Sequence, residues 1–268
     1  MNAELLPPRG SVERWAFDYV CSTSLAEKLQ PGAPPEIWEA AQRPRRLAAP
    51  GRPPELRVVS RAEKKRSLAT VRGRAQVLHA FFHHELQAAE LMAWALLAFA
   101  DAPLEFREGL LRIALDEVRH MGLYVREIER LGHRVGDFPV RDWFWLRVPA
   151  CPDPASFVAV MGLGLESANL DHSTHFAAAF RQAGDEAAAR VQEIIGLEEI
   201  AHVRFGVRWF DHFAGGLEFE AWRRALPPPL SPLLMRGLPL SRAARGRAGQ
   251  SEAFLDELER WQPDTPGS

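Results

Sequence analysis

The same short motif occurs twice in this sequence, each time inside a long stretch of helix-forming residues. It is Glu-x-x-His, present as Glu117 with His120 and as Glu199 with His202. Residues three apart share one face of an α-helix, so each pair can direct a carboxylate and an imidazole toward one point. Chance supplies about one such pair in a chain of this length, whereas two pairs in matching surroundings restrict the fold strongly.

A lone glutamate precedes each motif at nearly the same interval. Glu85 lies 32 residues before Glu117, and Glu166 lies 33 residues before Glu199. Each half therefore consists of a helix with a glutamate at this interval, a short break, and a helix with Glu-x-x-His. Two helices of each kind form the metal site of dinuclear carboxylate four-helix bundles. The repeat thus predicts two related helix hairpins that close on a single site.

Caps, glycines and prolines divide the chain into predicted elements. Long helices are expected at residues 67–100, 104–131, 153–182 and 186–213, and short ones at 11–30, 217–225 and 251–261. Seven prolines between residues 31 and 60 exclude regular structure there and predict an extended arm. Short breaks make the long helices antiparallel neighbours in pairs, and residues 132–152 form a longer connection.

The predicted fold class is all-α, namely a ferritin-like four-helix bundle of two helix hairpins joined by a long crossover, with N- and C-terminal wrapping segments. With 268 residues, of which 47% are hydrophobic, the chain can build such a core. Three parts are expected: an N-terminal helix with a Pro-rich wrapping arm at 1–66, the bundle at 67–214, and a C-terminal covering segment with short helices at 215–268.

Helical phase places the acids and histidines of the repeat on apolar faces. At about 100° per residue, their neighbours on those faces are mostly Leu, Ile, Phe, Met and Ala. Buried acids need neutralising charge, and four carboxylates balance two divalent cations. Oxygen and imidazole ligands without thiolates suit iron or manganese rather than structural zinc. We therefore predict two metal ions, iron in preference to manganese, bound by Glu85, Glu117, His120, Glu166, Glu199 and His202.

Three polar residues beside these ligands are expected to support them. Asp116 and Glu198 each directly precede a ligand glutamate, where a carboxylate can accept the free ring N–H of a histidine on a facing helix. The predicted partner of Asp116 is His202. Asn169 accompanies Glu166 on a face with smaller and more polar side chains, where space for a substrate is expected.

Two other sets of residues have competing interpretations. Glu90 and Asp171 occupy equivalent positions in the two halves and could form a second polar cluster with His175. Contacts with the wrapping arm and the tail are the favoured alternative. Tyr124 lies on the ligand face, where a redox role competes with the favoured role in core packing.

Taken together, the sequence motifs around the predicted ligands resemble a family of bacterial ferritin-like proteins of unassigned function. The resemblance extends from about residue 67 to 260, and it implies a relation to the wider ferritin-like group of di-iron tRNA hydroxylases, rubrerythrins, fatty-acyl desaturases and ferroxidases. Its motifs are His84-Glu85-Leu86-Gln87-Ala88, Asp116-Glu117-Val118-Arg119-His120, Leu165-Glu166 through Leu170-Asp171, and Glu199-Ile200 with His202-Val203.

Three functions are open at this point. The first is an O₂-dependent oxidase or hydroxylase, with an unknown small-molecule or anionic substrate and an external electron donor. The second is an iron-handling ferroxidase or a peroxide-detoxifying protein, although the chain has no Cys-x-x-Cys module and no acidic run for iron nucleation. The third is a metal-stabilised structural or interaction protein whose site is catalytically idle.

Charge and cysteine content limit the partners and the compartment. A net charge of −2 argues against nucleic-acid binding as the main role. Two cysteines give no disulfide framework, and no apolar run is long enough to span a bilayer. The predictions are therefore a cytoplasmic protein and no membrane partner, with a homodimer left open.

Basic residues are nevertheless concentrated in two places. A patch for an anionic partner, including a nucleic acid, is one interpretation. No aromatic residues alternate with these basic residues as they do on RNA-binding surfaces, so a solvated surface is the favoured alternative. The two runs are Arg57, Arg61, Lys64, Lys65, Arg66, Arg72 and Arg74, and Arg236, Arg242, Arg245 and Arg247.

Overall fold

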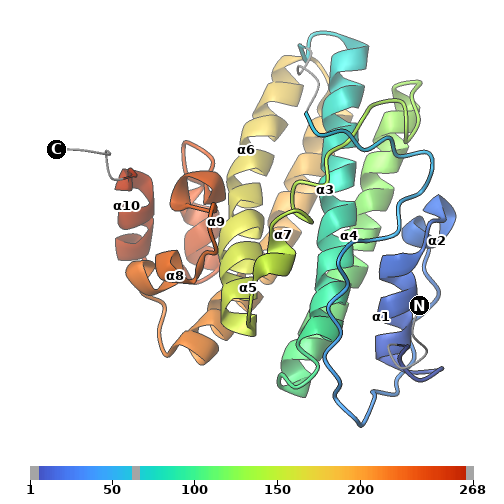
Figure 1. The fold of residues 1–268 in the computed structure, drawn as a ribbon. Helices are drawn as coiled ribbons and strands as arrows, with labels where there is room; N and C mark the ends of the chain where they lie inside the picture. Colours follow the sequence, from blue (N-terminus) through green and yellow to red (C-terminus); the bar gives the residue numbers. More distant parts are fainter. Residues whose placement is uncertain (1–5, 62–66, 264–268) are drawn as a thin grey trace. The chain divides into compact units, whose positions relative to one another are not determined.

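The computed structural model describes residues 6–61 and 67–263, and within these ranges all regular structure is helical (Figure 1). The all-α prediction is confirmed for this part of the chain. The chain divides into two compact units, an N-terminal unit, Met1–Pro149, and a C-terminal unit, Ala150–Ser268. None of the described helices combines the length and the apolar character needed to cross a membrane.

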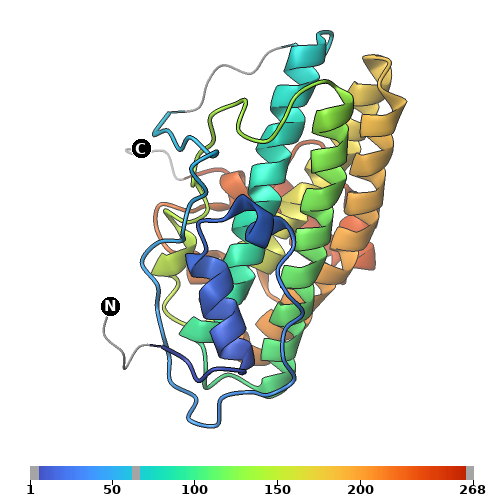
Figure 2. The ribbon, with the colours of Figure 1, turned by 90° about the vertical axis from the view of Figure 1, so that its right-hand side faces the viewer.

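Two long helices form the centre of the N-terminal unit. Helices α3 (Val71–Ala98) and α4 (Leu104–Arg130) run antiparallel and pack along their length (Figures 1 and 2). The Thr70 side chain caps α3, three residues beyond the predicted start. The predicted break before Pro103 is confirmed, and α4 ends before Gly132, whose φ of 76° favours glycine.

The N-terminal arm, which precedes α3 in the chain, packs against the α3–α4 pair. The predicted helix 11–30 is two helices, α1 (Val12–Cys21) and α2 (Leu25–Leu29), because Ser24 caps a new helix after an extended stretch. Helix α1 packs on α3, and α2 packs on α4. Beyond them, the Arg45 N–H donates to the carbonyl of Leu97 over 2.7 Å, and the Trp94 indole donates to the carbonyl of Leu47 over 3.0 Å. The Pro-rich segment is therefore an ordered arm on the helix pair.

The C-terminal unit repeats the hairpin. Helices α6 (Ser167–Gln182) and α7 (Glu186–Ala214) pack side by side. The predicted single helix 153–182 is interrupted, since α5 (Pro154–Val160) leads into a π-helical segment, η3 (Met161–Glu166), before α6 begins. Gly162 and Gly206 allow η3 and α7 to approach, because a Cβ added to Gly162 would lie 2.6 Å from the Gly206 Cα. The interruption ends at Glu166, a predicted ligand.

The chain beyond α7 covers the α6–α7 pair. It contains α8 (Phe219–Ala225), the 3-10 turn η4 (Pro232–Met235), α9 (Arg242–Arg247) and α10 (Glu252–Arg260). The Trp222 indole donates to the carbonyl of Ala159 over 2.9 Å, which fixes α8 on α5. Helices α8 and α10 were expected, whereas α9 was not, because its six residues are too few for a periodic pattern.

Both predicted hairpins are thus present, each within its own unit. That the two hairpins close into one ferritin-like four-helix bundle stays a prediction, as do the three predicted domain boundaries. Residues Lys64, Lys65 and Arg66 of the first basic run lie outside the described residues.

Candidate functional site

The two Glu-x-x-His motifs lie at the same depth in their helices. Glu117 is the fourteenth residue of α4, and Glu199 is the fourteenth residue of α7. Both positions lie near the helix centre, where backbone groups are already hydrogen-bonded within the helix. A ligand bound at this depth can therefore be held only by side chains.

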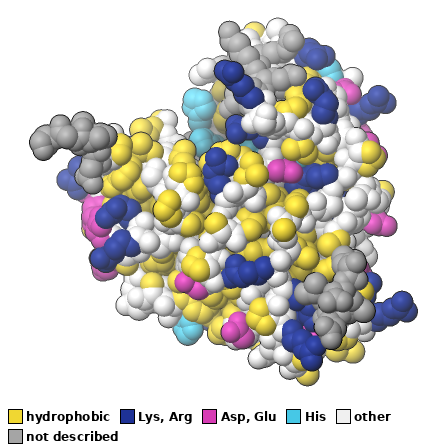
Figure 3. All heavy atoms as spheres, in the orientation of Figure 1, with side chains coloured by type: hydrophobic (Ala, Val, Ile, Leu, Met, Phe, Trp, Pro, Cys, Tyr) yellow, Lys and Arg dark blue, Asp and Glu magenta, His cyan; other side chains and the backbone are white. Residues whose placement is uncertain are grey.

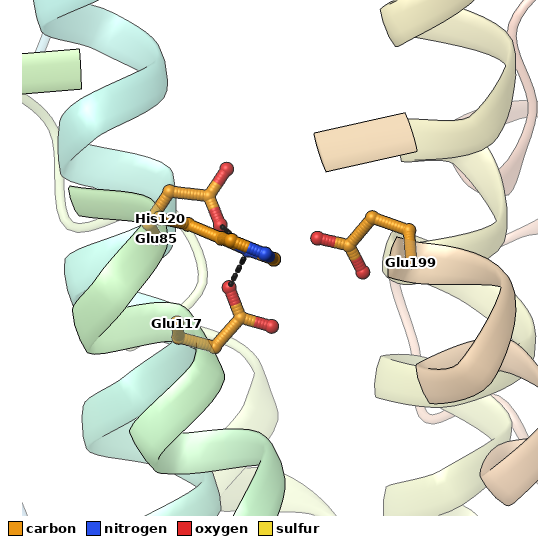
Figure 4. Close-up of side chains that lie close together, drawn as sticks. All are labelled: Glu85, Glu117, His120 and Glu199. Carbon is orange, nitrogen blue, oxygen red and sulfur yellow. Dashed lines mark ion pairs between the residues drawn. The ribbon is translucent and has the colours of Figure 1, made fainter. Parts of the chain in front are cut away.

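In the N-terminal unit, Glu85 of α3 joins Glu117 and His120 of α4. One ligand atom from each lies within 4.8 Å of the others. His120 Nδ1 is 3.6 Å from Glu85 Oε2 and 3.4 Å from Glu117 Oε2. Figure 4 shows these three side chains turned toward one another, with ion pairs dashed. All three are at most 4% exposed, so this is a buried group of metal-ligand residues, which we call the N-terminal group.

Electrostatics make two charged carboxylates in the N-terminal group unfavourable without a cation. Burial raises the pKa of Glu85 well above its ordinary value, and the neighbouring Glu117 carboxylate raises it further. His120 acts in the opposite direction but with less effect. Two carboxylates close together in a buried space repel each other, and a bound cation would remove that repulsion.

The C-terminal unit holds the matching set of Glu166, Glu199 and His202, which we call the C-terminal group. One ligand atom from each again lies within 4.8 Å of the others, and all three residues are buried. His202 Nδ1 is 2.9 Å from Glu199 Oε2. Asn169 Nδ2 donates to Glu199 Oε1 over 3.3 Å, so it contacts a ligand residue directly. Glu166 ends the π-helical segment, a feature often found at functional sites.

Each group can hold a metal ion on chemical grounds. Two carboxylates and one imidazole are hard and borderline donors, which suit divalent iron or manganese. The cysteines are elsewhere, since Cys21 is in α1 and Cys151 precedes α5. A thiolate site of the structural zinc type is therefore excluded at both groups.

The predicted supporting acids are less buried than the ligands. The Asp116 side chain is 48% exposed, and Arg119 approaches it to 3.6 Å. Glu198 is partly buried on α7. Their predicted role, which is to accept a histidine ring N–H and in the case of Asp116 that of His202, stays a prediction.

Glu90 belongs to a network with the N-terminal arm. Glu90 Oε1 accepts Lys28 Nζ over 2.8 Å and Arg52 Nη1 over 2.6 Å, and Oε2 accepts the Trp145 indole over 2.8 Å. Asp142 is bound in turn by Arg52 over 2.9 Å. The alternative favoured for Glu90 from the sequence was contact with the wrapping arm, and Lys28 and Arg52 make such contacts. The Glu90 network consists of Lys28, Arg52, His83, Glu90, Asp142 and Trp145.

The basic members of this network were missed by sequence reasoning. Lys28 is fully buried, and its only sequence signal is its place in a short amphipathic segment. Arg52 stands between Gly51 and Pro53 in the arm, where no periodicity indicates burial. Pairing with a distant acid is a tertiary property that neither local pattern contains.

Asp171 has an equivalent role in the C-terminal unit. The Arg245 guanidinium donates to both of its carboxylate oxygens, over 3.0 and 2.7 Å. The backbone N–H groups of Gly237 and Ser241 donate to it as well, over 2.8 and 2.7 Å. His175, the third member of the predicted polar cluster, is exposed on α6, whereas Asp171 is buried. Asp171 thus anchors the C-terminal covering segment, which is the alternative favoured for it, and the polar cluster with Glu90 and His175 stays a prediction.

Tyr124 is fully buried on α4 and lies parallel to a phenylalanine of α3. Its ring centroid is 5.8 Å from that of Phe81, and the two planes are stacked. This contact agrees with the packing role favoured for Tyr124. The redox role stays a prediction.

His79 is a further buried polar residue of α3, and its ring has a defined protonation state. Its Nε2 accepts the Gly136 N–H over 2.8 Å, so this nitrogen carries no proton. Burial lowers the pKa of His79 to about 4, with a further lowering by His83 and an opposing effect from Asp137. Through this hydrogen bond the neutral imidazole of α3 holds Gly136, which lies in the connection after α4.

Two arginines of the C-terminal basic run form ion pairs within the C-terminal unit. Arg245 is bound to Asp171, and Arg242 pairs with Glu252, Asp256 and Glu259. On the face drawn in Figure 3, described Lys and Arg side chains are scattered in small groups among hydrophobic and acidic ones. The nucleic-acid prediction gains no support from these contacts.

Comparisons with known proteins match most of the chain to one family model. Residues 13–256 match the model of a family described as "Protein of unknown function (DUF455)". An uncharacterized protein of Haemophilus influenzae is 33% identical over 163 residues, which are 58% of this chain and 57% of the relative. The chain thus spans little more than half of that relative's length. No solved structure matches the chain significantly.

Proposed function

The chain belongs to the DUF455 family, whose description assigns no function, and from its residues we propose a non-haem di-iron protein of the oxygen-dependent oxidase or hydroxylase type. The observation that carries the proposal is the occurrence of two matching buried groups, each with two carboxylates and one imidazole. Together the two groups supply the four carboxylates and two histidines of a dinuclear carboxylate centre.

The charges support two divalent ions. Each group carries two acids, and the proposed pair of ions supplies the four positive charges that balance them. The sequence repeat supports a shared centre, because Glu85 precedes Glu117 by nearly the same interval as Glu166 precedes Glu199. Iron is proposed ahead of manganese because mixed oxygen and imidazole ligands with open positions are typical of oxygen-activating iron.

The residues of the chain have distinct tasks in this proposal. When bound, the metal pair supplies the binding and reduction of O₂, with electrons from an external donor. Asn169 donates to Glu199 Oε1 and so fixes the orientation of a ligand carboxylate. The burial of both groups excludes bulk water, which limits side reactions of a reactive oxidant. The substrate is proposed to be a small or anionic molecule.

Metal analysis of single variants tests the site. Wild-type protein reconstituted anaerobically with Fe(II) is expected to bind about two equivalents, as in other carboxylate bundles. If the ions share one centre, Glu117→Ala and Glu199→Ala should each lose more than one equivalent. Separate sites would instead lose one each, and retention of both ions in both variants would disprove the ligand assignment. Glu129→Ala, an exposed acid of α4, is the matched control and should keep both ions.

Oxygen consumption tests the chemistry. Exposure of the reconstituted protein to O₂ should consume oxygen, and the Glu117→Ala variant should not. An unreactive but filled site would show that the metal is structural. Continued oxidation of added Fe(II) beyond two equivalents per chain, with no organic substrate, would point to a ferroxidase instead.

A further inference from the structure

The N-terminal unit contains a cavity whose lining includes no proposed metal ligand and, of the Glu90 network, His83 alone. Its volume is about 290 Å³, close to the lower end of the range of about 300–1,000 Å³ for small-molecule sites. One wall is formed by α3 and the other by the connection that follows α4. It is therefore a space for a small ligand on the surface of the helix pair.

Most of the cavity wall is apolar and aromatic. Val77 and Phe81 line it from α3, and Val140 and Trp143 line it from the connection. Val77, Phe81 and Val140 are each under 8% exposed, so the wall is part of the packed core. Aromatic rings of a ligand stack on such walls with an energy beyond that of area burial alone. The shape and chemistry of the wall fit a flat apolar body.

The polar residues that line the cavity include one with a permanent positive charge, Arg141, and the others are Gln76, His83 and His84. Arg141 lines it and is partly buried, and no residue within the described ranges forms a hydrogen bond or ion pair with its guanidinium. The adjacent acid, Asp142, is already bound by Arg52 and by His83. A guanidinium that faces an apolar cavity without a carboxylate has the planar donor geometry that binds a ligand carboxylate in two places.

The Arg147 guanidinium adds a second positive charge beside Trp143, a residue of the cavity wall. Arg147 lies over the Trp143 ring, 4.1 Å from its centroid, and donates to the Trp143 carbonyl over 3.0 Å. Burial lowers the pKa of Arg147, and the charge of Arg141 lowers it further. Two like charges near one aromatic wall favour an anion between or beside them.

From the cavity, its aromatic wall and an Arg141 guanidinium that no residue in the described part of the chain neutralises, we infer a binding site for a small aryl carboxylate. The carboxylate binds the Arg141 guanidinium, and the aromatic body lies between Phe81 and Trp143. Phe81 precedes Glu85 by one turn of α3, so the bound ring lies on the same helix as the N-terminal group. The inference stands on the cavity alone and does not require the metal centre.

Calorimetric titration of the full-length protein with 3-phenylpropionate tests the inference. The neutral analogue 3-phenylpropan-1-ol has the same ring and chain, and it should bind at least tenfold more weakly. Arg141→Gln should weaken binding of the acid at least tenfold, because charge-assisted hydrogen bonds contribute most of the polar affinity. Arg134→Gln, which changes an exposed arginine of the same connection, should leave binding unchanged.

Location is tested by filling the cavity. Ala80 lines it and is partly exposed, so Ala80→Phe can occupy the space without disturbing the core, and this variant should lose binding. Equal affinity for the acid and the alcohol, or full affinity in the Arg141→Gln variant, would overturn the proposed carboxylate contact. The absence of binding to correctly folded wild-type protein, or inorganic phosphate binding as tightly as 3-phenylpropionate, would overturn the assignment of the ligand class.

Discussion

Replacing Glu90 by glutamine is expected to destabilise the protein severely, because Glu90 neutralises buried positive charge. Its carboxylate has 0% exposure, as does the Lys28 side chain 2.8 Å away, and it also accepts Arg52 over 2.6 Å. Glutamine keeps the size of the side chain but removes the charge. The network then holds two cations and one acid, Asp142, which is bound to Arg52.

The magnitude follows from the distances. At an effective dielectric constant of about 20, the attraction across 2.8 Å is about 6 kcal/mol, from which the cost of desolvating the ions must be subtracted. Removing one partner of a buried pair costs about 3–5 kcal/mol in measured cases. A typical domain has a free energy of unfolding of about 5–15 kcal/mol, so Glu90→Gln should remove at least about a fifth of it.

Urea denaturation followed by circular dichroism measures this change. Lys28→Met combined with Glu90→Gln should be more stable than Glu90→Gln alone, because the remaining Arg52 and Asp142 again balance. Glu220→Gln, which removes an exposed partner of Arg223, is the control and should leave stability nearly unchanged. A loss below about 1 kcal/mol in Glu90→Gln, or no rescue in the double variant, would refute the argument.

The pH dependence of the same variant provides a second measurement. Burial lowers the pKa of Lys28, and Glu90 partly opposes that lowering. Without Glu90 the pKa of Lys28 falls further below its ordinary value of 10.5, so the unfolded chain binds more protons than the folded one between the two pKa values. Stability then increases with pH, and the deficit of Glu90→Gln relative to the wild type should shrink between pH 7 and pH 9. A deficit that stays constant over this range would show that Lys28 remains charged.

Two further predictions concern other positions in the fold. The pKa of His79 is lowered from 6.5 to about 4, so its contribution to stability is complete above pH 6.5 and is lost as the pH falls toward 4. His79→Gln should therefore reduce the change in the free energy of unfolding over this pH range, measured by urea denaturation, by up to about 3 kcal/mol. An unchanged pH dependence would contradict a neutral His79 in the folded protein. Gly162→Ala should lower stability by about 1–3 kcal/mol through collision with Gly206, whereas Gly122→Ala on α4, where nothing lies closer than 3.7 Å, should be neutral or raise stability by up to about 1 kcal/mol. Equal thermal midpoints for these two variants would show that η3 and α7 have room to separate.

The two hairpins could be predicted from the sequence because their signals are local. Pro103 and Gly132 bound α4, and the Gly184-Asp185 turn separates α6 from α7, as expected from proline and glycine geometry. The ligand residues were found for a similar reason, since spacing along a helix determines which side chains share a face. The structure brings together the residues of each predicted half.

Other features depend on contacts that no local pattern contains. The π-helical segment that ends at Glu166 consists otherwise of Met, Leu and Gly, so its sequence has no alternation of polar and apolar residues that could reveal the wider turn. Lys28 and Arg52 become recognisable only once the arm lies on α3, and Arg245 only once its segment folds back on Asp171. In each case a charged residue is buried because a distant partner neutralises it.

The equal depth of the two Glu-x-x-His motifs is the strongest reason to propose that both motifs have the same function. Helix α4 begins after Pro103 without a side-chain cap, whereas α7 begins with the capping residue Asp185, and the connections before them have different lengths. Despite these differences, Glu117 and Glu199 are both fourteenth in their helices. Packing alone would not place a carboxylate at a buried helix centre, because an uncompensated buried charge is unfavourable. A requirement for two equivalent cation ligands explains both the position and the residue type.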